Sequence, residues 1–106
     1  RTTYGGAIIF YKMELTTAYQ YYLKAKSAYP YDLGEVAEML DYALSYDDEC
    51  APALCLMGQI QMEALKDFDA AEHYFQRALI ADPRYVDTYK YLSKLLIWIG
   101  SIAKAE

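Results

Sequence analysis

Residues 54–83 read LCLMGQIQMEALKDFDAAEHYFQRALIADP, and the spacing of small and bulky residues in this stretch decides the fold. Its apolar side chains return every three or four positions, which is the period of amphipathic helices. Gly58 and Ala71 are small enough to let two helices approach closely, while Phe75 is large enough to fill the space between them. Asp67 interrupts the pattern in the middle and Pro83 closes it, so the stretch predicts two helices paired as an antiparallel hairpin.

The same spacing recurs in the neighbouring segments, which is typical of a repeat protein. Matches at a distance of 35 residues fall on both sides of the quoted stretch, at Val36, Leu40, Ala43, Tyr89, Leu92 and Ser93. Phe68 and Ala71, in contrast, reappear after only 34 residues as Ile102 and Ala105. Every 35-residue match spans Gly58–Lys66, so one inserted residue in that stretch explains both offsets.

This pattern resembles the tetratricopeptide repeat, whose signature runs from a large residue and Leu-Gly to Ala, an aromatic four places on, and a closing Pro. The resemblance spans roughly Thr17–Glu106 and is strong in the middle but weak at the start. It implies an all-α chain of stacked antiparallel helix hairpins, an α-solenoid of about 2.5–3 repeats. The expected division is an extension of the first helix at 1–16, a degenerate repeat at 17–50, a repeat with the insertion at 51–85 and an incomplete repeat at 86–106.

Local signals predict where the helices begin and end. Asp32 followed by Glu35 is a capping box, Pro52 suits the first turn of a helix that runs to about Leu65, and Asp67 can cap the helix after it. The remaining boundaries come from a stop at Asp82–Pro83, a start near Val86, a stop at Gly100 and a new cap at Ser101. The first helix is expected to be long, from about Ala7 to Ala28.

Composition and charge narrow the class of partner. Apolar residues make up 56% of the chain and 13 residues are tyrosines, which need a wet or hydrogen-bonded hydroxyl, so we expect a thin core. A net charge of −5 disfavours nucleic acid and anionic lipid as general partners. No apolar run approaches the roughly 18 residues that a membrane helix needs, so membrane insertion is not expected.

The sequence offers no group for catalysis. His73 is the only histidine and sits between Glu72 and Tyr74, where a solvated surface position is expected. Cys50 and Cys55 are too few for a disulfide framework or a metal site and are expected to be reduced and partly buried. No glycine-rich loop suggests a phosphate site. We therefore predict a protein that is not an enzyme and has no cofactor or metal.

The resemblance implies that the first helix of each repeat lines a groove that holds an extended peptide or a partner helix. The groove positions expected on this basis are Tyr21, Ala25, Cys55, Gln59, Glu63, Lys90, Lys94 and Trp98. A purely structural role is the alternative for each of them, and for Trp98 it is packing under Leu95 or Ile102. Lys90 and Lys94 are one turn apart and would attract an acidic segment, unless they are simply solvated.

Two functions remain open. The first is an adaptor that binds a protein or peptide partner in the groove. The alternative is a self-assembly element that forms a homo-oligomer through exposed apolar repeat ends. Its grounds are the many tyrosines expected to be exposed and the unfinished third repeat, which would leave Leu92, Leu95, Leu96 and Ile99 partly uncovered, since apolar patches tend to find partners.

Overall fold

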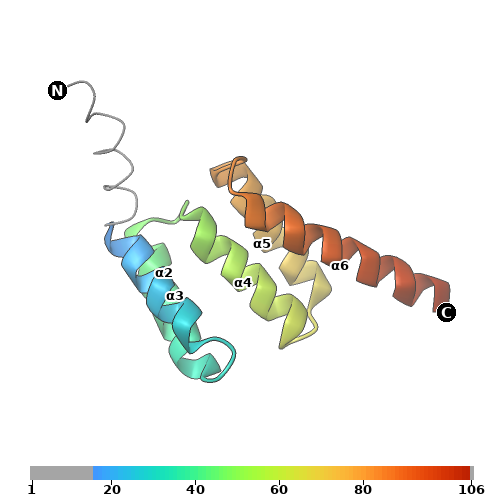
Figure 1. Ribbon diagram of the computed structural model, residues 1–106, viewed down its shortest axis with the longest axis horizontal. Coiled ribbons are helices and arrows are strands. Elements are labelled where there is room, and N and C mark those ends of the chain that lie inside the picture. Colours follow the sequence, from blue (N-terminus) through green and yellow to red (C-terminus); the bar gives the residue numbers. More distant parts are fainter. Residues whose placement is uncertain (1–15, 106) are drawn as a thin grey trace. The chain divides into compact units, whose positions relative to one another are not determined.

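The computed structural model describes residues 16–105, and in this range the chain is helical, without strands (Figure 1). The helices are α2 (Thr17–Ala28), α3 (Leu33–Tyr46), α4 (Ala51–Glu63), α5 (Phe68–Ala81) and α6 (Val86–Ala105). The predicted all-α class is confirmed for the described range. The chain divides into two compact units, residues 1–48 and residues 49–106.

The first unit contains a hairpin of α2 and α3. Helix α2 buries Ala18, Tyr22 and Ala25, and α3 buries Val36, Leu40 and Ala43. Both sets follow the three-to-four-residue spacing of a single helix face, so each helix presents one apolar stripe to the other. Only Tyr22, Val36 and Leu40 are large, which makes this a thin core of the kind that the composition predicts.

The second unit is built around the pair α4 and α5. Gly58 of α4 is buried, and a Cβ atom placed on it would lie 2.6 Å from Cε1 of Phe75 on α5. Phe75, Ala71 and Ala78 are all fully buried on the facing side of α5. The predicted fit of small residues against one large ring is therefore confirmed for this hairpin. Close approach is possible because Gly58 carries no side chain.

Helix α6 covers the rest of this pair and contacts both α5 and α4. The Leu95 side chain on α6 is fully buried, so the expectation that this residue would stay partly uncovered is wrong. The Tyr91 ring stacks on Phe75 with 6.5 Å between ring centroids and an interplanar angle of 9°. The aromatic core of the unit thus continues from α5 into α6.

The predicted helix starts agree with the structure. Asp32 Oδ1 accepts a hydrogen bond from the Glu35 N–H over 3.1 Å, and Asp67 Oδ1 accepts one from the Ala70 N–H over 3.1 Å. Pro52 lies in the first turn of α4, as its lack of an N–H allows. In a complete capping box, the Glu35 side chain would accept a hydrogen bond from the Asp32 N–H. Here the Asp32 N–H donates to the carbonyl of Ala28 instead.

Two boundaries differ from the prediction. A helix continuous from Ala7 to Ala28 is wrong, because Thr16 is extended and caps α2 by accepting from the Tyr19 N–H; residues before Thr16 lie outside the described range. The stop at Gly100 and the new cap at Ser101 are also wrong, because α6 continues to Ala105. Gly100 has a negative φ, and a glycine ends a helix through a left-handed turn that this chain does not make there.

The inserted residue corresponds to a longer interval between helix caps. From Thr16 to Asp32 the chain advances 16 residues, whereas from Cys50 to Asp67 it advances 17. Before Asp67, Lys66 adopts a left-handed conformation with φ of 57°. The N–H of Asp67 then donates to the carbonyl of Gln61 over 2.8 Å. This turn ties the end of α4 to the start of α5.

Candidate functional site

The expected groove positions divide into buried and accessible ones. Ala25 and Cys55 are only 0% and 3% exposed, so both side chains belong to the packing and a partner cannot reach them. The accessible positions are Tyr21, Gln59 and Glu63, which are half-buried, and Lys90, Lys94 and Trp98, which are exposed. Small side chains such as those of Ala25 and Cys55 occur both on groove surfaces and between packed helices. Helical spacing alone therefore could not show that these two residues lie between helices.

Lys90 and Lys94 gather around one aromatic ring of α6. Each Nζ atom lies 5.4 Å from the centroid of the Tyr91 ring. Since Tyr91 is itself stacked on the buried Phe75, the ring that collects the two cations is anchored in the core. A cation beside an aromatic face is attracted by the ring quadrupole, which holds these ammonium groups close to a half-buried surface. The two charges are therefore concentrated in one place.

Trp98 extends this surface toward the turn before α5. Its ring meets Phe68 edge-on with 6.2 Å between centroids, and Lys66 Nζ lies 5.0 Å from its centroid. The ring remains 40% exposed. Lys90, Lys94 and Trp98 follow one another at intervals of one helical turn, so they share a face of α6. We call Lys90, Lys94 and Trp98 the α6 face.

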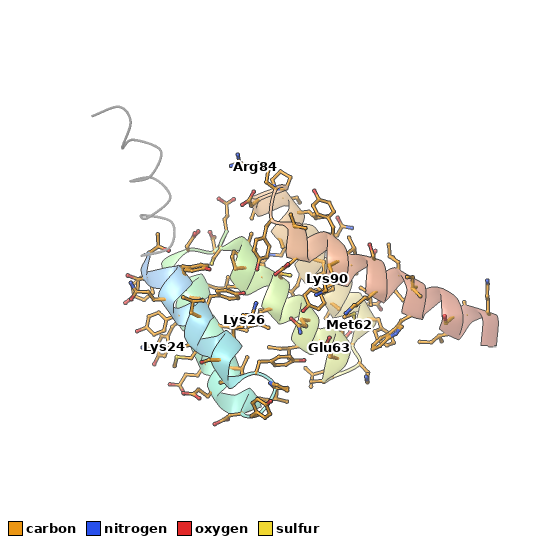
Figure 2. All side chains as sticks on the ribbon, viewed as in Figure 1. Lys24, Lys26, Met62, Glu63, Arg84 and Lys90 are labelled. Carbon is orange, nitrogen blue, oxygen red and sulfur yellow. The ribbon has the colours of Figure 1, made fainter. Side chains whose placement is uncertain are left out.

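The charge of α6 opposes that of the whole chain. Three lysines against Asp87 give the helix a net charge of +2, although the chain as a whole carries −5. Figure 2 labels Lys90 on α6 and Glu63 on α4, two helices that contact each other. On α4, Gln59 Nε2 donates to Glu63 Oε1 over 3.1 Å, which fixes both polar side chains one turn apart. Helix α4, which contacts α6, therefore carries a carboxylate and an amide that are bonded to each other.

A second side of α6 is apolar and exposed. It consists of the side chains Val86, Tyr89, Leu96 and Ile97, which are 47–73% exposed. Val86, Tyr89, Leu96 and Ile97 recur at the spacing of one helical face. Exposed apolar side chains that adjoin one another mark interaction surfaces more often than scattered ones do.

Sequence analysis missed an aromatic group on the first unit. Tyr21 of α2 lies against two tyrosines of α3, with ring centroids 5.1 Å from Tyr42 and 5.8 Å from Tyr46. We call these three residues the tyrosine cluster. The spacing of Tyr42 and Tyr46, one helical turn apart, was visible in the sequence, but their contact with Tyr21 depends on how α2 and α3 pair.

The only histidine is exposed as predicted, whereas the two cysteines are more deeply buried than the partial burial that was expected. His73 is exposed on α5, next to Tyr74, and Cys50 and Cys55 are buried thiols. Within residues 16–105, three or more His, Cys, Asp or Glu side chains do not come together in a way that could hold a metal ion. None of the helices in the described part is both long and apolar enough to cross a membrane.

Comparison of the chain with protein-family models, with curated proteins and with solved structures finds no match. Over residues 16–105 the structure defines an all-helical protein of paired helices, whose exposed surfaces indicate what it can bind.

Proposed function

We propose that the chain is a protein-binding module of the tetratricopeptide type that holds an acidic segment of a partner on the α6 face. The repeat assignment is supported by the sequence spacing and by the matching positions of the caps Asp32 and Asp67, 35 residues apart at the starts of the second helices. The close fit of Gly58 against Phe75 agrees with the small and large positions of the family signature.

The observation that carries the binding proposal is the pair of lysines on Tyr91 beside the exposed Trp98. A carboxylate that approaches Lys90 and Lys94 can pair with both ammonium groups, while an apolar side chain of the same segment lies on the Trp98 ring. Charge complementarity of this kind steers association and fixes the register of the partner. Exposed ion pairs alone contribute little, so the tryptophan is required for useful affinity.

A peptide titration tests this proposal. The probe is a fluorescein-labelled peptide rich in Glu and Leu, and fluorescence anisotropy measures its Kd. We expect Lys90→Glu/Lys94→Glu to weaken binding about tenfold, since two attractive pairs of up to about 1 kcal/mol each become repulsive. The control is Lys24→Glu/Lys26→Glu, which changes the net charge equally on the other unit. Equal weakening by both double variants would show that net charge, not the α6 face, determines binding.

The exposed apolar side of α6 favours self-association as a second candidate function. Leu96 and Ile97 are 52% and 66% exposed and adjoin each other on that side. A symmetric contact between two copies would bury them. Light scattering over a concentration series decides this: self-association predicts a mass that grows with concentration and falls back to the monomer in Leu96→Lys/Ile97→Lys. A monomer at every concentration excludes it.

A further inference from the structure

The first unit carries a surface of opposite character to the α6 face, formed by the tyrosine cluster on its exposed side. Tyr46 is 63% exposed and Tyr42 is 44% exposed, while the half-buried Tyr21 lies behind them. The Tyr21 and Tyr46 rings are nearly parallel, with an interplanar angle of 11°. Contact with Tyr21, stacked for Tyr46 and tilted for Tyr42, orients both exposed rings without burying them. A partner would therefore meet two oriented aromatic side chains.

Tyrosines of this unit already bind cations within the chain. Lys24 Nζ lies 5.3 Å from the Tyr21 ring centroid, and Lys26 Nζ lies 5.9 Å from that of Tyr22. These contacts leave large parts of the Tyr42 and Tyr46 side chains exposed. The same interaction with a cation from another molecule is physically available there.

Helix α3, which carries both exposed rings, is rich in carboxylates. The described residues of the first unit contain two lysines against six carboxylates, a net charge of −4, and all six carboxylates lie on α3 or at its ends: Asp32, Glu35, Glu38, Asp41, Asp47 and Asp48. Glu38 precedes Tyr42 by one turn and Tyr42 precedes Tyr46 by one turn, so a carboxylate and two rings follow each other along one helix face. The surface therefore favours a cationic partner over an anionic one.

We propose that Tyr42 and Tyr46, supported by Tyr21, form a docking surface for an arginine-containing segment of another protein. Arginine suits it better than lysine because a planar guanidinium can stack on a tyrosine ring and donate two parallel hydrogen bonds to a carboxylate such as that of Glu38. Aromatic rings and carboxylates on one helix face match both properties. This surface lies on a different unit from the α6 face, so the inference does not depend on the proposed function.

The test compares two fluorescein-labelled peptides of equal length and charge, one of oligo-arginine and one of oligo-lysine, by anisotropy against the full chain at about 0.15 M salt, where exposed charges are partly screened. We expect the arginine peptide to bind about tenfold more tightly, the combined effect of cation–π contacts at two exposed rings. In Tyr42→Leu/Tyr46→Leu, which keeps apolar bulk but removes both rings, the arginine preference should fall well below tenfold.

Two controls keep the result specific. Tyr31→Leu removes a tyrosine that is 89% exposed and lies outside the cluster, so it should leave the arginine preference unchanged. Tyr42→Phe/Tyr46→Phe keeps both rings and should retain the preference, which separates the rings from the hydroxyl groups. Equal binding of the two peptides by the unaltered chain overturns the proposal, and so does an arginine preference that is undiminished in Tyr42→Leu/Tyr46→Leu.

Discussion

The contact between Gly58 and Phe75 gives the sharpest test of how the second unit is packed. A Cβ atom on Gly58 would lie 2.6 Å from Cε1 and 2.7 Å from Cδ1 of the Phe75 ring. Non-bonded carbon atoms prefer separations of about 3.5–4.0 Å, so one of the two groups must move by roughly 1 Å. Phe75 is fully buried and stacked on Tyr91, which leaves its ring little room to turn away.

The expected effect of Gly58→Ala is the difference between two opposing terms. Replacing glycine by alanine inside a helix stabilises it by about 1 kcal/mol, because alanine loses less backbone entropy. Extra volume in a packed core costs about 1–3 kcal/mol. The steric term should exceed the helical one, so we expect a net destabilisation of about 1 kcal/mol, with about 2 kcal/mol as the upper limit.

Gly100 provides the matched control, because it lies in the same unit, within α6, and a Cβ atom there would meet nothing within 4 Å. Gly100→Ala should therefore show the helical gain alone, up to about 1 kcal/mol. Urea unfolding measures both variants, followed by circular dichroism and by the fluorescence of Trp98, the only tryptophan. With a slope near 1 kcal/mol per molar urea, the midpoints should move in opposite directions, by about 1 M for a change of about 1 kcal/mol.

The result that would refute this reasoning is a Gly58→Ala variant as stable as Gly100→Ala. A double-mutant cycle with Phe75→Leu then locates the effect. Phe75→Leu alone destabilises by removing core contacts, but in that background Gly58→Ala should no longer be unfavourable, because the ring atoms it would meet are gone. Purely additive effects would mean that the cost of Gly58→Ala does not come from Phe75.

Two further substitutions test single interactions of the second unit. Asp67→Ala should destabilise it by about 1 kcal/mol, since the Ala70 N–H loses its acceptor, while Asp67→Asn should retain most of the stability. Urea midpoints followed by Trp98 fluorescence measure both variants. An unchanged midpoint for Asp67→Ala would show that the cap does not stabilise the helix. Thr88 Oγ1 is fully buried and has no hydrogen-bond partner among the described residues, so Thr88→Val should be neutral or stabilise by up to about 2 kcal/mol. A loss of more than about 1 kcal/mol in Thr88→Val would show that the hydroxyl is bonded in solution.

The features that could be predicted from the sequence are those set by neighbouring residues or by a strict packing requirement. The caps at Asp32 and Asp67 act on amide groups three residues away, so their type and position are sufficient. Gly58 and Phe75 were predictable because a close helix pair needs one small and one large residue at facing positions. Such requirements hold wherever the hairpin occurs.

The errors arose where a local signal depends on its surroundings. Gly100 resembles a helix stop, yet a glycine inside a helix costs only about 1 kcal/mol, which α6 tolerates when no turn follows. In the sequence, Thr16 cannot be distinguished from a threonine inside a helix. The structure shows that its side chain accepts a hydrogen bond from the Tyr19 N–H, which makes it the N-cap of α2. The tyrosine cluster could not be predicted because Tyr21 and Tyr42 belong to different helices, and periodicity describes each helix separately.

The overall charge of −5 conceals two surfaces of opposite sign, and this separates the two binding proposals. An acidic segment fits α6 with its charge of +2 and is repelled by the first unit, whose described residues carry −4, whereas an arginine segment has the reverse preference. Acidic and arginine peptides titrated against the same variants should therefore respond to different substitutions. Lys90→Glu/Lys94→Glu should weaken only the acidic peptide, and Tyr42→Leu/Tyr46→Leu should weaken only the arginine peptide. A variant that weakens both peptides would indicate lost folding, because no single surface attracts both charges.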